Sequence, residues 1–80
     1  MDQSTMPLSA AKEGITMRVD SLPAHSILRD RLIAMGVKPG VLVEVLRRGK
    51  PGGILHVACG ILEFMIRQEH AALIDVSQLA

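Results

Sequence analysis

The sequence predicts a small, mainly β protein in which five short strands close into a barrel and one α-helix follows the first strand. Three observations support this. The chain has only 80 residues, so it can form one domain that buries about 60% of its unfolded surface. Apolar residues make up 49% of it, with one Phe and no Trp or Tyr, so the core must be aliphatic. Several short segments alternate apolar and polar residues, as half-buried strands do, whereas one segment has the helical period.

Charge and cysteine content exclude several classes of protein. Nine Lys and Arg against eight Asp and Glu leave a net charge of +1, whereas nucleic-acid-binding domains usually have a larger basic excess and stacking aromatic side chains. Cys59 is the only cysteine, so neither an intramolecular disulfide nor a two-cysteine zinc motif can form. The sequence contains no signal-peptide pattern and no uninterrupted apolar run of about 18 residues. We therefore expect a cytoplasmic protein that is not inserted in a membrane and does not bind nucleic acid.

The N-terminal part contains a tail, a helical turn and the first predicted strand. Residues 1–6 are polar and aperiodic, which predicts a disordered tail before a single domain over residues 7–78. Ser9 can cap a short helical turn over residues 10–13. Residues 15–20 then alternate strictly, which places three side chains on the buried face of a strand: Ile15, Met17 and Val19.

The only substantial helix is predicted over residues 26–35. Its apolar residues recur at positions i, i+4 and i+7 and form one stripe, consisting of Leu28, Leu32 and Met35. The charged residues between them, Arg29 to Arg31, mostly face water. Gly36 is expected in the left-handed conformation that ends a helix, with Val37 packed on Leu32. Pro39 and Gly40 then predict a type II turn.

Further strands and a helical turn complete the predicted barrel. Residues 41–48 form a strand with Val41, Val43 and Val45 on one face, and residues 54–58 form the next strand. Residues 68–72 suggest a short helical turn, and the last strand follows it near residues 73–77. Closing the strands into a barrel would remove the exposed edges of an open sheet.

A tight hairpin is predicted after the strand at residues 54–58. If Cys59 and Gly60 form a two-residue loop, His56 lies directly opposite Glu63. Two apolar pairs then share the inner face of the sheet: Val57 with Leu62, and Leu55 with Phe64. A slip of one residue would move the apolar set of one strand to the other face.

Several segments resemble the ferrous iron transport protein A (FeoA) family. Residues 32–40, which read Leu-Ile-Ala-Met-Gly-Val-Lys-Pro-Gly, resemble the family's helix end and the Pro-Gly turn that follows it. Residues 43–47 are similar to its first strand after the helix. Residues 66–76 match its closing pattern, in which Arg67, Ala71, Ile74 and Val76 have the same spacing as in the family. With Leu22-Pro23-Ala24, these motifs cover about residues 7–76 in the right order and spacing.

The resemblance implies an SH3-like barrel and a role in bacterial uptake of ferrous iron. It also implies a small cytosolic accessory protein that binds and modulates the cytosolic part of a GTPase-linked Fe²⁺ permease (FeoB). One segment departs from the family pattern. Many members carry Gly-Asp-Pro between the two central strands, where this chain has Gly52-Gly53-Ile54. That loop is expected to be more flexible, and no role of the family's Asp or Pro can be transferred to it.

Motifs of enzymes are missing from the sequence, and the alternative function is transition-metal binding. It contains no nucleophile elbow, phosphate-binding loop or zinc helix, which indicates a protein that is not an enzyme. His56 and Glu63 would be cross-strand neighbours, with Cys59 nearby, but so few ligands make at most a weak, exchangeable site for Fe²⁺ or Zn²⁺. A solvated polar pair is the simpler interpretation, and no cofactor is required. A similar domain at the C-terminus of some metal-dependent repressors leaves a metal-sensing role open.

A surplus of apolar residues points to a binding partner. Four of them fall out of phase with the inward-facing sets of the strands: Leu42, Leu46, Ile61 and Met65. A barrel this small cannot cover both faces, so we expect them to form, with Leu28, Leu32 and Met35, an apolar groove that binds the permease. One alternative is that the helix and the termini cover them all. Another is an RNA-binding SH3-like domain, which the near-neutral charge disfavours. Exposed strand edges would also allow weak self-association.

Overall fold

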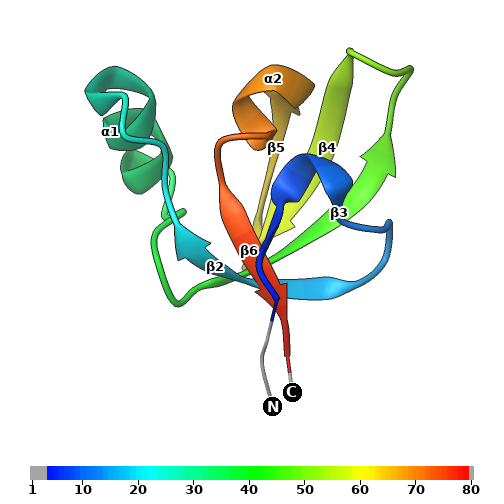
Figure 1. Cartoon of the computed structure of the whole chain (residues 1–80), viewed down its shortest axis with the longest axis horizontal. Helices are drawn as coiled ribbons and strands as arrows, with labels where there is room; N and C mark the ends of the chain where they lie inside the picture. Colours follow the sequence, from blue (N-terminus) through cyan, green and yellow to red (C-terminus); the bar gives the residue numbers. More distant parts are fainter. Residues whose placement is uncertain (1–3, 80) are drawn as a thin grey trace.

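The computed structural model describes residues 4–79, whose strands form one antiparallel sheet (Figure 1). The six strands lie in the order β1-β6-β2-β3-β4-β5. In chain order the elements are β1 (Met6–Pro7), the 3₁₀ turn η1 (Leu8–Ala10), β2 (Thr16–Ser21), α1 (Ser26–Ala34), β3 (Leu42–Arg48), β4 (Ile54–Cys59), β5 (Leu62–Arg67), α2 (Gln68–Ala71) and β6 (Asp75–Gln78). The predicted class, mainly β with one substantial helix after the first long strand, is confirmed.

The predicted closure of the barrel is wrong, because the sheet remains open with β1 and β5 as its edges. β1 was not predicted as a strand. It forms because Met6, assigned to the tail, pairs with Val76 of β6, and Pro7 pairs with Asp75. A two-residue strand with Pro suits a sheet edge, where the missing N–H removes no ladder hydrogen bond. The disorder predicted for residues 1–3 lies outside the described residues.

The first helical turn lies earlier than predicted. It spans Leu8–Ala10 rather than residues 10–13, and no side chain caps it. Leu8 is fully buried, and its burial, rather than capping by Ser9, determines where the turn lies. The Arg48 guanidinium donates hydrogen bonds to the carbonyls of Ser9 and Ala11, which ties the turn to β3.

Helix α1 begins and ends through local hydrogen bonds. His25 precedes it, and its Nδ1 accepts a hydrogen bond from the Leu28 N–H at 3.4 Å. At the other end Gly36 has φ +89°, and the Val37 N–H donates to the Leu32 carbonyl at 2.9 Å. This is the Schellman arrangement, in which a left-handed residue lets the chain leave the helix while its last carbonyls stay bonded.

Two β-bulges bend the sheet. In β3, Val45 lies opposite Val57 and Arg47 opposite His56, so Leu46 is an extra residue without a direct partner. A second shift lies in β2 at Asp20, beside β6. Bulges increase the local twist. In Figure 1, accordingly, β2 runs almost horizontally whereas β4 and β5 rise steeply.

The hairpin between β4 and β5 has a register that differs by two residues from the predicted one. Cys59 lies opposite Leu62, and the loop consists of Gly60 and Ile61. Val57 therefore faces Phe64, and Leu55 faces Ile66. The first loop position needs a positive φ in a turn of type II′, and Gly60 provides it with φ +65°. Since the shift is even, the inner face keeps its apolar side chains, but Leu62 becomes exposed.

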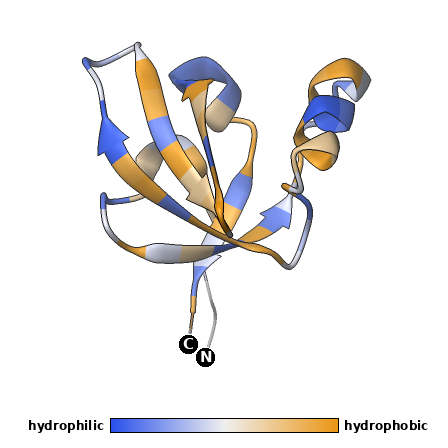
Figure 2. Ribbon diagram, turned by 180° about the vertical axis from the view of Figure 1, so that it is seen from behind, coloured by the Kyte–Doolittle hydropathy of each residue, from blue (hydrophilic) through white to orange (hydrophobic). Residues whose placement is uncertain are grey.

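One aliphatic core lies between the sheet and the short helical segments. In Figure 2 the strands alternate between hydrophobic and hydrophilic residues, as half-buried strands do. Every element except β1 contributes to this core. The buried side chains include Met17, Val19, Val43, Val45, Leu55, Val57, Ile66, Ile74 and Val76. Ile15 was predicted to join them, but it precedes β2 and is exposed.

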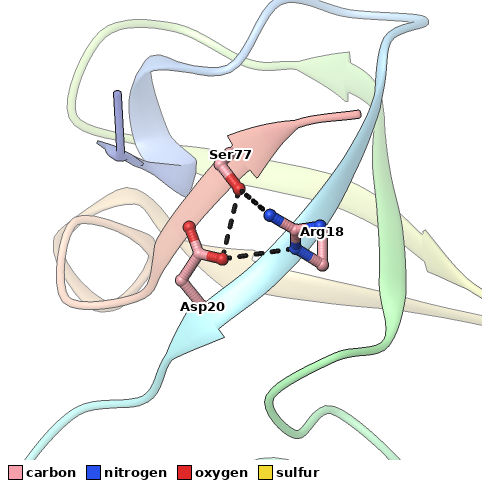
Figure 3. Close-up of polar contacts among 3 residues, drawn as sticks. All are labelled: Arg18, Asp20 and Ser77. Carbon is pink, nitrogen blue, oxygen red and sulfur yellow. Dashed lines mark hydrogen bonds and ion pairs between the residues drawn. The ribbon is translucent and has the colours of Figure 1, made fainter. Parts of the chain in front are cut away.

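A polar cluster on β2 and β6 is shown in Figure 3. Ser77 is only 1% exposed, and its hydroxyl donates to Asp20 Oδ1 at 3.1 Å. Arg18 donates to Ser77 Oγ at 3.2 Å and forms an ion pair with Asp20 at 3.5 Å. Because a buried hydroxyl without partners would be costly, this cluster helps to fix how β2 and β6 pair.

Candidate partner-binding groove

A groove of about 510 Å³ lies between α1 and the edge strand β5. Figure 1 shows α1 standing at the side of the sheet, at the same end of the molecule as α2. Within α1 only Leu32 is fully buried, so the helix touches the core along a narrow line and leaves space beside it. The groove is lined by Leu28, Arg31, Leu32, Met35, Phe64, Met65, Ile66, Arg67 and His70.

Four of the seven residues predicted to bind a partner line this groove. They are Leu28, Leu32, Met35 and Met65. Leu28 and Met35 are half-buried, and the Met65 side chain is 65% exposed at the rim. Leu32 is buried, whereas the other three positions combine apolar surface with access from solvent, which a docking site requires.

The other three predicted residues lie elsewhere. Leu42 is exposed at the start of β3, and Leu46 is half-buried at the bulge. Ile61 occupies the tip of the β4–β5 turn, where it is fully exposed. The groove is therefore smaller than the surface that the alternation pattern suggested.

The polar lining of the groove is basic. Arg31 projects from α1, Arg67 ends β5, and His70 belongs to α2. Among residues 4–79, no Asp or Glu lines the groove. The sequence pattern assigned Arg31 to the solvent face of the helix and did not place Arg67 or His70. The spacing of Arg31, three residues after Leu28 and four before Met35, could have indicated its position, because residues three and four apart are neighbours on a helix.

A smaller hollow of about 290 Å³ continues the groove towards the N-terminus of α1. It shares Leu28, Arg31 and His70 with the groove and adds Ile27 and Leu73, both of which are exposed. The two hollows therefore form one apolar surface that runs along α1, with Arg31 at its middle.

The loop between β3 and β4 is a tight turn. Its Gly53 N–H donates to the Lys50 carbonyl at 2.9 Å, and Gly52 takes φ +79°. Gln68 holds this turn from both sides, since its Oε1 accepts from the Gly52 N–H and its own N–H donates to the Gly53 carbonyl, both at 2.8 Å. A hollow of about 690 Å³ lies beside the turn, with Arg47 and His56 in its wall.

The three candidate metal ligands are only partly brought together. His56 faces Met65 across the hairpin rather than Glu63, yet its Nε2 lies 2.9 Å from Glu63 Oε1 because the two residues are diagonal neighbours. The Cys59 thiol instead lies 3.8 Å from the Gly36 carbonyl, and burial raises its pKa. Within the described part of the chain, no group of three His, Cys, Asp or Glu residues could hold a metal ion.

A family model and several solved structures identify one family. The model of the FeoA domain family matches residues 6–78. FeoA from Chlorobium tepidum is 33% identical with a TM-score of 0.86, over 94% of this chain and 71% of that one. FeoA from Stenotrophomonas maltophilia, solved with zinc and described as an SH3 domain protein, is 27% identical with a TM-score of 0.78, over 89% of this chain and 88% of that one.

A transcriptional repressor shares the fold as well. The manganese-dependent repressor has a TM-score of 0.87 at 21% identity, and this chain spans 44% of its length. No curated protein matches the sequence. In residues 4–79, no helix is long and apolar enough to cross a bilayer.

Proposed function

Because the chain belongs to the FeoA family of accessory proteins of ferrous iron transport, we propose that it binds the cytosolic part of an FeoB-like, GTPase-linked Fe²⁺ permease and modulates it. The observation that carries the proposal is the groove between α1 and β5. It offers the apolar walls of Leu28 and Met35 next to the exposed Met65.

The groove suits a protein partner better than a small molecule. It is open along an edge strand, and its apolar lining continues into the smaller hollow beside Ile27 and Leu73. Methionine side chains adapt to the shape of a partner, and two of them, Met35 and Met65, line the groove. An exposed apolar surface of this kind is typical of an interaction site.

Calorimetric titration with the purified cytosolic part of the permease tests the proposal. We expect saturable binding by the wild type and binding about tenfold weaker for Met65→Asp, because a charge at the rim must be desolvated on docking. Leu42→Asp is the matched control, since Leu42 is also exposed but lies outside the groove. It should bind within about threefold of the wild type. No binding by the wild type would refute the proposed function, and equal losses in both variants would refute the groove.

A second candidate function is weak, exchangeable binding of Fe²⁺ or Zn²⁺ at His56 and Glu63. The 2.9 Å contact between their side chains favours it, because an imidazole and a carboxylate this close can share one ion. Anaerobic titration should then show weak, saturable binding that His56→Ala abolishes. His70→Ala serves as the control and should bind as the wild type does. Equal affinity in the wild type and His56→Ala would reject this site.

A further inference from the structure

The charged side chains that line the groove are all basic, and this bears on what the groove binds. Arg31 and Arg67 both line it, and within residues 4–79 neither guanidinium has an ion-pair partner or a side-chain hydrogen bond. We propose that the groove takes an acidic segment of the protein partner. An apolar side chain of that segment enters between α1 and β5, and its flanking carboxylates bind Arg31 and Arg67. This inference rests on the proposed function and specifies the chemistry of the partner.

Three other arginines have contacts of their own, whereas Arg47 lines the hollow beside the β3–β4 turn. Arg18 binds Asp20, Arg29 lies 4.0 Å from Asp30, and Arg48 donates to backbone carbonyls. The two groove arginines differ from these three in lining an apolar surface that contains no carboxylate. Since the whole chain has a net charge of only +1, these two charges in one groove form a local concentration of positive charge.

Among residues 4–79, none of the nearby carboxylates lines the groove. Glu63 lies on β5, but it contacts His56 at 2.9 Å. Glu69 lies on α2, with its Oε2 3.9 Å from His70 Nε2, and does not line the groove. Asp30 lies 4.0 Å from Arg29 and is also outside the groove. An incoming carboxylate therefore meets no Asp or Glu in the described lining, and Glu69 contacts that lining at His70.

The chemistry of the site favours a carboxylate next to an apolar side chain. A guanidinium presents its N–H donors as a planar fork that fits a carboxylate with two parallel hydrogen bonds. Apolar walls exclude water from such a pair and strengthen it. A volume of about 510 Å³ has room for a few side chains, which suits a short segment rather than a whole domain.

Charge variants of the groove test the inference with the permease fragment as the probe. Arg31→Gln and Arg67→Gln should each weaken binding about tenfold, because each removes a charge-assisted contact. Raising the NaCl concentration from about 50 to about 300 mM should weaken wild-type binding more than that of the double variant. Arg29→Gln removes an arginine from the same helix outside the groove and should bind within about twofold of the wild type.

The outcomes separate this inference from the proposed function. If the wild type binds and the groove variants bind equally well, the acidic partner is refuted while the function stands. If the wild type does not bind the fragment, the function fails, and peptides then decide the inference. The acidic peptide acetyl-Asp-Leu-Glu-Leu-amide should shift the backbone amide NMR signals of Arg31 and Arg67, whereas acetyl-Lys-Leu-Lys-Leu-amide should not. Equal shifts with both peptides, or none with either, would refute the inference.

Discussion

At the scale of single residues, one glycine determines where the β4–β5 hairpin turns. The sequence offered Cys59 and Gly60 as the loop, which would put a cysteine at the first loop position. The chain instead places Gly60 there, with φ +65°, and Ile61 second. A positive φ is costly for any residue with a Cβ atom, so the turn moves by one position to give it to glycine.

Gly60→Ala should therefore destabilise the protein by about 1 kcal/mol, because alanine is strained at this φ. The cost is purely one of backbone conformation, since a Cβ added at Gly60 would meet no atom within 4 Å. Urea denaturation gives the free energy of unfolding. Ile61→Ala, in the same turn, should change it by less than about 0.5 kcal/mol because Ile61 is fully exposed. A Gly60→Ala protein as stable as the wild type would contradict this reading of the turn.

At the scale of elements, the bulge at Leu46 reverses the direction of the side chains that follow it. Arg47 then lies opposite the exposed face at His56, whereas Arg48 lies opposite the buried Leu55. From there Arg48 reaches over the core and binds η1 through the carbonyls of Ser9 and Ala11. Its backbone N–H also donates to Glu13 at 2.6 Å. The bulge thus links the N-terminal segment to the centre of the sheet.

Arg48→Lys should lower the free energy of unfolding by about 1–2 kcal/mol, because an ammonium group cannot bind two carbonyls with the geometry of the guanidinium fork. The same substitution at the neighbouring Arg47, which is exposed, should change it by less than about 0.5 kcal/mol. Thermal or urea unfolding measures both. If the two variants are equally stable, the contact between Arg48 and η1 contributes nothing.

At the scale of the whole molecule, one aliphatic core holds together an open sheet and a helix that stands at its side. Helix α1 reaches this core through Leu32, and Val37 anchors the chain again directly after the helix. This narrow attachment leaves room for the groove between α1 and β5. The groove therefore results from the loose packing of α1 against the sheet, and no single element forms it alone.

Leu32→Ala should cost about 2–4 kcal/mol, since it leaves a cavity where the helix meets the sheet. Ile33→Ala, on the exposed side of α1, should cost less than about 1 kcal/mol. Because the core is one cluster, circular dichroism at 222 nm and the methyl NMR signals of Val45 should report the same urea midpoint. Loss of the helix at a clearly lower urea concentration would show that α1 is not part of the cooperative unit.

Much of the fold could be predicted because it depends on local patterns. Alternation placed Met17, Val43 and Val57 on buried faces, and the Gly36 signal ended the helix within one residue of its observed end. Motifs at residues 32–40 and 66–76 were enough to identify the FeoA resemblance, which the match over residues 6–78 confirms. The hydrophobic period and the conformational freedom of glycine act within a few residues, so sequence alone expresses them.

Other features required the tertiary structure. Alternation predicts a face only while the register is unbroken, and the bulges at Asp20 and Leu46 break it. Closure of the sheet depends on total twist and on contacts between distant strands, so five or six strands by themselves do not decide it. The groove likewise joins Leu28 and Arg31 of α1 to Arg67 of β5, residues more than thirty positions apart in the sequence. Sequence patterns determined which residues could be buried, and long-range packing determined which of the rest became a site.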